Sequence, residues 1–180
     1  MDPEPAGLVE DPVFQIRSSF RREGESLVVD TWIDPGGGVT PHIHPAMEER
    51  FETVEGTAQF LAGRRWQDTP AGQGVLVPPG TRHAFRNRSG EVAHIRCHAT
   101  PPSTLEEFLT EAAAMSRAGR INRFALPTSP GALLEIAAMA ERHRDMVVMS
   151  SPPRPVQKLL LPPLAKLGAK RLRSQAPPAH

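Results

Sequence analysis

The chain has 180 residues, of which 39% are hydrophobic and 23% are charged, and this balance is ordinary for one globular domain with extensions. A formal net charge of +1 gives no electrostatic reason to expect a nucleic-acid partner, and no apolar run approaches the roughly 18 residues of a transmembrane helix. The single cysteine, Cys97, excludes an intramolecular disulfide, and the amino terminus lacks the basic and apolar regions of a secretory signal. We therefore expect a cytoplasmic protein that neither spans a membrane nor binds nucleic acid.

The first hundred residues are typical of a β domain. Residues 1–12 are acidic and rich in proline, and we expect them to form a flexible amino-terminal arm. Between residues 13 and 100, apolar and polar residues alternate in short runs bounded by glycine and proline, which predicts strands. The clearest runs are 26–33, 50–54, 57–62 and 91–99.

A group of histidines and a carboxylate predicts a metal site in this β domain. His42 and His44 are two residues apart, so an extended segment presents both imidazoles on one face. Glu49 can return to the same point if the chain turns after His44, with the neighbouring Glu48 as a possible substitute. A third histidine, His83, follows a short apolar strand framed by turn residues. Imidazole with one carboxylate suits iron, manganese, nickel, copper or zinc.

The spacing of these residues resembles the two sequence motifs of the cupin superfamily. The fixed positions of the first motif match Gly36, His42, His44, Glu49 and Gly56, which are separated by five, one, four and six residues in turn. The fixed positions of the second motif match Gly72, Pro78, Gly80, His83 and Asn87, which are separated by five, one, two and three residues in turn. The resemblance implies a mainly β fold, the double-stranded β-helix or jelly-roll barrel, with one divalent transition metal per chain. It also implies that the metal is held by His42, His44, Glu49 and His83.

Other side chains are candidates for a substrate pocket around the metal. We expect Phe51, Phe60 and Phe85 to form its apolar wall. The run 91–99 has a second, polar face. If this face looks into the barrel, Arg96 would bind an anionic substrate and His98, or the nearby His94, would act as a base. If it looks outward, these side chains are solvated, and the alternation favours the outward orientation.

From residue 101 the composition favours helix. We expect residues 101–180 to form a helical extension packed on the barrel or on a second subunit, with helices near 103–118 and 130–144. A third helical stretch, 156–173, is interrupted at Pro162 and Pro163 and is strongly basic. Such a segment can lie on a membrane or contact an acidic partner, but we expect its leucines to pack on the barrel or on another subunit and its charges to face water. The arrangement resembles single-domain bacterial cupins with helical C-terminal extensions. Because barrels of this kind commonly bury edges or faces against a copy, we predict a homodimer.

These observations support three hypotheses about function. The first is a metal-dependent oxygenase, with iron favoured, that acts on a small organic molecule. The second is a non-oxidative isomerase, cyclase or decarboxylase in which the metal polarises a carbonyl. The third is a metal-containing module that binds a small ligand. The sequence has no tyrosine and offers no evident base, which favours the oxygenase.

Overall fold

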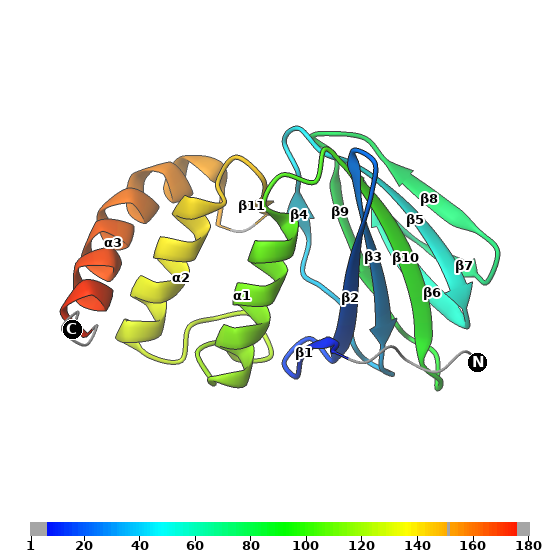
Figure 1. Ribbon diagram of the computed structural model, residues 1–180, viewed down its shortest axis with the longest axis horizontal. Helices are drawn as coiled ribbons and strands as arrows, with labels where there is room; N and C mark the ends of the chain where they lie inside the picture. Colours follow the sequence, from blue (N-terminus) through cyan, green and yellow to red (C-terminus); the bar gives the residue numbers. More distant parts are fainter. Residues whose placement is uncertain (1–6, 151, 176–180) are drawn as a thin grey trace.

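The computed structural model describes residues 7–150 and 152–175 and has two antiparallel sheets and three helices (Figure 1). The six-stranded sheet has the order β1-β2-β3-β10-β5-β8. Its strands are β1 (Val9–Asp11), β2 (Ile16–Glu23), β3 (Ser26–Ile33), β10 (Ala93–Thr100), β5 (Glu48–Glu55) and β8 (Gly74–Val77). The five-stranded sheet contains β11 (Val148–Met149), β4 (His42–Ile43), β9 (Arg82–Arg86), β6 (Thr57–Ala62) and β7 (Arg65–Pro70), in this order. The predicted mainly β jelly-roll fold with C-terminal helices is confirmed.

The two sheets enclose the core because their strands alternate as the sequence predicted. In β10, Ala93, Ile95, Cys97 and Ala99 are all buried, whereas the residues between them are partly exposed. Phe51 on β5 and Phe60 on β6 meet across the sheets with their ring centroids 5.1 Å apart. Burial of apolar side chains stabilises the fold by about 25 cal/mol per Å² of apolar surface removed from water.

The amino-terminal segment is better ordered than we predicted. Residues 9–11 form β1 and pair with β2, although the sequence predicted a flexible arm over residues 1–12. The Asp11 carboxylate accepts hydrogen bonds from the backbone of Val13 and Phe14 and from the Ser116 hydroxyl. This buried carboxylate therefore ties β1 to the first helix. Residues 1–6 of the predicted arm lie outside the described residues.

The three helices are α1 (Leu105–Arg117), α2 (Pro130–Arg142) and α3 (Arg154–Gln175). Helix α1 lies nearest to the barrel and α3 farthest from it (Figure 1). We expected Pro162 and Pro163 to interrupt this helical stretch, but both lie within the continuous helix α3. The helix continues through them while packing on α2, so closely that a Cβ at Gly168 would lie 2.4 Å from the Leu134 carbonyl oxygen. Among the described helices, none is long and apolar enough to cross a membrane.

After α2 the chain returns to the barrel and adds a strand that the sequence did not predict. In β11, Val148 pairs with Ile43 and Met149 pairs with His42. The Ser150 amide then donates a hydrogen bond to the Pro41 carbonyl, with the two atoms 3.1 Å apart. The helical extension is therefore hydrogen-bonded to the strand that carries His42 and leads into His44.

Candidate metal centre

Four side chains from both sheets converge on one point inside the barrel. His42 lies on β4 directly opposite His83 on β9, His44 follows β4, and Glu49 reaches the same point from β5 in the other sheet. One potential ligand atom from each of the four lies within 4.8 Å of the others. Ligands bound about 2.0–2.2 Å from one metal ion lie up to about 4.4 Å apart, so a small adjustment brings all four into a coordination sphere.

Backbone carbonyls orient the imidazoles of His42 and His83. The Nδ1 atom of His42 lies 2.9 Å from the Thr40 oxygen, and the Nδ1 atom of His83 lies 2.9 Å from the Thr81 oxygen. Because a carbonyl oxygen only accepts hydrogen bonds, each Nδ1 must carry the hydrogen and donate it. In the neutral tautomer this leaves the lone pair on Nε2, as in histidines that bind metal through Nε2.

His44 is oriented in the same way, but by the segment that follows α2. Its Nδ1 donates to the Met146 carbonyl at 2.7 Å, and both residues are buried. The contact joins residues 102 positions apart in the chain. The helical extension therefore fixes the orientation of one of the four candidate ligands.

Two of the atoms that face the centre are buried without a hydrogen-bond partner. They are Oε2 of Glu49 and Nε2 of His83, which lie 2.6 Å apart but without the geometry of a hydrogen bond. The same carboxylate oxygen is 3.6 Å from Nε2 of His44. Leaving such atoms unsatisfied in the interior is costly, and a cation between them would interact with all of them. The donor set thus fits a divalent transition metal.

Three of the four candidate ligands favour the protonation state that binds a cation. Burial, together with the neighbouring His83 and His44, lowers the pKa of His42 to about 3, and burial also lowers the pKa of His44. Burial alone would raise the pKa of Glu49, but contact with His83 and the charges of the histidines outweigh it and lower the pKa to about 2. At neutral pH the site therefore holds a carboxylate beside neutral imidazoles at His42 and His44. Burial opposes protonation of His83, but Glu49 outweighs it and raises the pKa of this imidazole.

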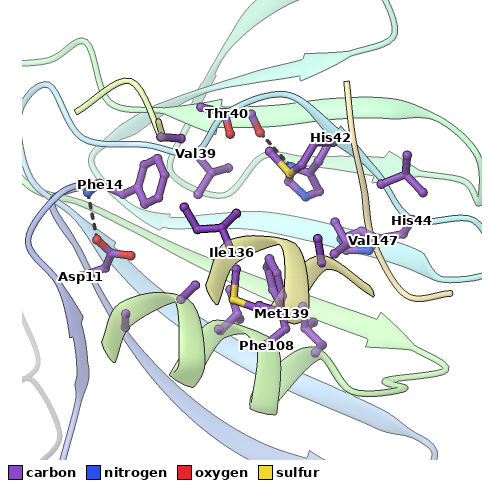
Figure 2. A pocket seen from close by; sticks show the side chains of 18 of the residues that line it. Asp11, Phe14, Val39, Thr40, His42, His44, Phe108, Ile136, Met139 and Val147 are labelled. Atoms are coloured by element: carbon purple, nitrogen blue, oxygen red, sulfur yellow. Dashed lines mark hydrogen bonds between the residues drawn. The ribbon is translucent and has the colours of Figure 1, made fainter. Parts of the chain in front are cut away.

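A cavity of about 710 Å³ opens from this centre between the barrel and the helices. His42, His44 and Glu49 are among its lining residues. Phe108 of α1 and Met139 of α2 project into the cavity from the helices, across from Val39 and His42 of the barrel (Figure 2). The wall near the metal centre is thus mostly apolar, as is usual for sites that bind small organic molecules.

The five predicted pocket residues do not all lie in this cavity. Phe51 and Phe85 line it, whereas Phe60 packs behind them in the core and is 1% exposed. Arg96 and His98 lie on the opposite face of β10 from its cavity-lining residues, the outward orientation that we preferred. We therefore correct the pocket prediction by removing Phe60, Arg96 and His98.

On the outer face, Arg96 belongs to an ion-pair network instead of a substrate site. Its guanidinium lies 2.9 Å from the Asp30 carboxylate, which also contacts His94 at 2.9 Å and Arg21 at 2.5 Å. The His94 ring stacks on Trp32, with their centroids 4.4 Å apart. These contacts account for Arg96 and His94 on the polar face of β10.

Sequence reasoning missed the contribution of the helices to the cavity. Phe108, Leu109 and Ala112 of α1 line the cavity, whereas the sequence predicted only a helix near residues 103–118 and not that it would lie opposite the metal centre. Met146 was missed because it acts through its backbone carbonyl, which any residue possesses. Only the apolar spacing of α1 and α2 gave a signal for these lining residues.

Comparison with known proteins places the β domain in a family. The family model described as "Cupin domain" matches residues 23–98. This region is a cupin domain. The chain is 34% identical over 85 residues to a protein named "Polyketide synthase CurC" from Streptomyces cyaneus. That alignment covers 46% of this chain and 55% of the relative, so the chain spans about half the length of that protein.

Solved structures also resemble about half of the chain. TT1209 from Thermus thermophilus is 20% identical, with a TM-score of 0.46, and the match covers 48% of this chain and 84% of that one. KdgF from Halomonas sp. is 16% identical, with a TM-score of 0.46, and the match covers 51% of this chain and 84% of that one. We infer no activity from likenesses of this degree.

Proposed function

We propose that the cupin domain holds a divalent transition metal at His42, His44, Glu49 and His83 and acts as an oxygenase on a small, largely apolar organic molecule. The proposal is carried by one observation, the convergence of three imidazoles and a carboxylate at the wall of an apolar cavity. Iron is the favoured metal, with manganese, nickel, copper and zinc as alternatives, because this donor set accepts all of them.

The residues around the centre have distinct tasks in this proposal. A bound redox metal would supply dioxygen chemistry, with four protein ligands leaving positions open in a five- or six-coordinate sphere. The backbone carbonyls behind the histidines hold the imidazoles in place before the metal binds, which reduces the reorganisation on binding. Phe51 and Phe85, together with Phe108 from α1, keep water from the bound substrate.

The side chains beside the centre favour oxygenation over an isomerase or cyclase reaction that needs a protein base. Cys97 lines the cavity 3.7 Å from Glu49, and burial together with that carboxylate raises the pKa of its thiol well above the usual range. Asp11 also lines the cavity, but two backbone amides and the Ser116 hydroxyl occupy one of its carboxylate oxygens. The Cys97 thiol therefore stays protonated at neutral pH and does not act as a base, and Asp11 is engaged in structural hydrogen bonds through one oxygen.

The substrate class is suggested by the cavity and by one relative. A volume of about 710 Å³ accommodates a molecule of several fused or linked rings. The relative from Streptomyces cyaneus is named a polyketide synthase, which makes phenolic and polyketide-like compounds the first class to test. We propose substrates of this class, with decarboxylation, isomerisation or cyclisation as the alternative reaction types and ligand binding without turnover as the remaining alternative.

The test begins with elemental analysis of protein purified without a histidine tag or chelator. Iron- and manganese-loaded protein is then assayed in an oxygen electrode against phenolic, diketone and polyketide-like compounds, with His83→Ala treated identically as the control. About one redox metal per chain and substrate-dependent oxygen uptake, both lost in the control, would support the proposal. Zinc with no oxygen uptake under any loading would shift the assignment to Lewis-acid chemistry, and no metal binding at all would refute the metal site.

A further inference from the structure

The mouth of the cavity carries two cations that the proposed chemistry does not use. Arg154 and Lys158 both line the cavity, and both lie in the first turns of α3. Residues four apart on a helix project from the same side, so the guanidinium and the ammonium can act on one group. We propose that they form an anion-binding subsite, so that the cavity takes amphipathic molecules with an apolar body and an anionic end. The inference rests on the proposed function, because it specifies the substrate class of the same cavity.

The other charged residues at the mouth of the cavity pair with one another and leave Arg154 and Lys158 to bind an anionic group of a ligand. Glu141, Arg144 and Asp145 also line the cavity, but Arg144 lies 2.5 Å from the Glu141 carboxylate and 3.8 Å from that of Asp145. By contrast, Arg154 and Lys158 have no carboxylate within ion-pair distance in the described part of the chain. Two cations without a protein anion at the edge of an apolar cavity attract an anionic group at low energetic cost, because they remain partly hydrated.

The subsite is also fixed relative to the metal centre. Gln157 lies between the two cations in sequence, and its side-chain amide donates to the Met149 carbonyl at 2.8 Å. Met149 pairs with His42, one of the four candidate ligands. The start of α3 is therefore connected through β11 to the strand that carries the metal site. A substrate with its anionic end at Arg154 and Lys158 would have its apolar body within the cavity, beside the reacting centre.

The other lysines of α3 provide an internal comparison. Lys166 and Lys170 are exposed on the same helix but are not among the cavity-lining residues. A general attraction of the basic helix for anions would involve all four cations equally. A subsite at the cavity mouth depends on Arg154 and Lys158 alone, so neutralising the two pairs separately distinguishes these explanations.

The experiment uses two dyes that differ only by the anionic group. 8-Anilinonaphthalene-1-sulfonate has the anion, and N-phenyl-1-naphthylamine has the same ring system without it. Fluorescence titration compares the wild-type chain with the double variant Arg154→Gln/Lys158→Gln and with the matched control Lys166→Gln/Lys170→Gln. We expect the first variant to bind the sulfonate about tenfold more weakly and the neutral dye within about twofold of wild type, since each solvated ion pair contributes at most about 1 kcal/mol. Added salt should reduce the difference.

Three results would overturn the inference. They are equal sulfonate affinities in the wild type and the first variant, an equal loss in the control, and failure of both dyes to bind the wild type. Circular dichroism of each variant establishes that it is folded before titration. Metal content is measured on the same wild-type samples, so the two proposals fail separately. Metal binding without sulfonate discrimination refutes the anion subsite, whereas discrimination without metal binding refutes the metal-dependent function.

Discussion

The substitution Glu49→Gln, with Glu48→Gln as its matched control, tests the role of the buried carboxylate. On β5 the side chains alternate, so Glu49 points inward to the three histidines, whereas the side chain of Glu48 is 44% exposed and lies 3.6 Å from Arg50. Glutamine has nearly the same shape but no charge. We expect the variant to bind metal at least about 100-fold more weakly, because even changes to groups that only support a ligand cost about 10- to 100-fold.

The loss can be measured as a change in thermal stability on adding metal. At a free metal concentration about 100 times its dissociation constant, binding stabilises the wild type by about 2.7 kcal/mol. In a chain of this length that raises the melting temperature by about 5–10 °C. For Glu49→Gln the same concentration would give about 0.4 kcal/mol, or about 1–2 °C. A wild-type response in Glu49→Gln, or a larger loss in Glu48→Gln, would show that the wrong carboxylate was assigned.

Three further predictions concern the ligands, the outer face and assembly. His42→Ala and His83→Ala should each remain folded by circular dichroism but lose metal, and full metal stoichiometry in either would refute the ligand assignment. Burial raises the pKa of Asp30, but Arg96, His94 and Arg21 outweigh it and lower the pKa below 3.8. Asp30→Asn should therefore cost about 1–3 kcal/mol of unfolding free energy at pH 7 in urea titrations. This difference should shrink as the pH falls below about 4, because protonation removes the wild-type advantage; a constant difference would contradict the argument. Sedimentation should give twice the chain mass of 19.6 kDa, and a monomer at micromolar concentration would refute the homodimer.

The sequence was most informative where one chemical rule determines the position of a side chain. Residues two apart on a strand share a face, and this rule correctly separated Ile95 and Cys97 from Arg96 and His98. The motif spacing singled out four residues, and the structure gathers their ligand atoms within 4.8 Å. The metal itself stays a prediction, because side-chain convergence indicates a site but not its occupant.

The features that the sequence did not predict depend on tertiary contacts. Hydrogen bonding of His44 to the Met146 carbonyl requires β11 to pair with β4, and a two-residue strand has too little alternation to be recognised. Pro162 and Pro163 predicted a break because each lacks the amide hydrogen that continues a helix. Packing of α3 against α2 at Gly168 is a tertiary contact that local propensity does not include.

Asn87, the last fixed position of the second motif, offers a test of why that position carries an amide. Its side chain is fully buried, and Nδ2 donates to the carbonyls of Ile33 at 2.8 Å and Glu91 at 2.7 Å. Its Oδ1 accepts hydrogen bonds from the amide and hydroxyl of Ser89. Asn87→Asp preserves the shape and the two accepted bonds but turns an oxygen toward the two carbonyls.

We expect Asn87→Asp to lower the unfolding free energy by about 2–5 kcal/mol at pH 7, because it replaces two donated hydrogen bonds with repulsion of a buried charge. Both effects raise the folded-state pKa of the introduced carboxyl above its unfolded value. The destabilisation relative to wild type should therefore decrease as the pH falls through that raised pKa, because the protonated carboxyl regains one donor. Urea unfolding of both proteins between pH 4 and pH 8 measures this dependence. A small cost that does not change with pH would mean that the Asn87 donors are dispensable and that the position is held by shape alone.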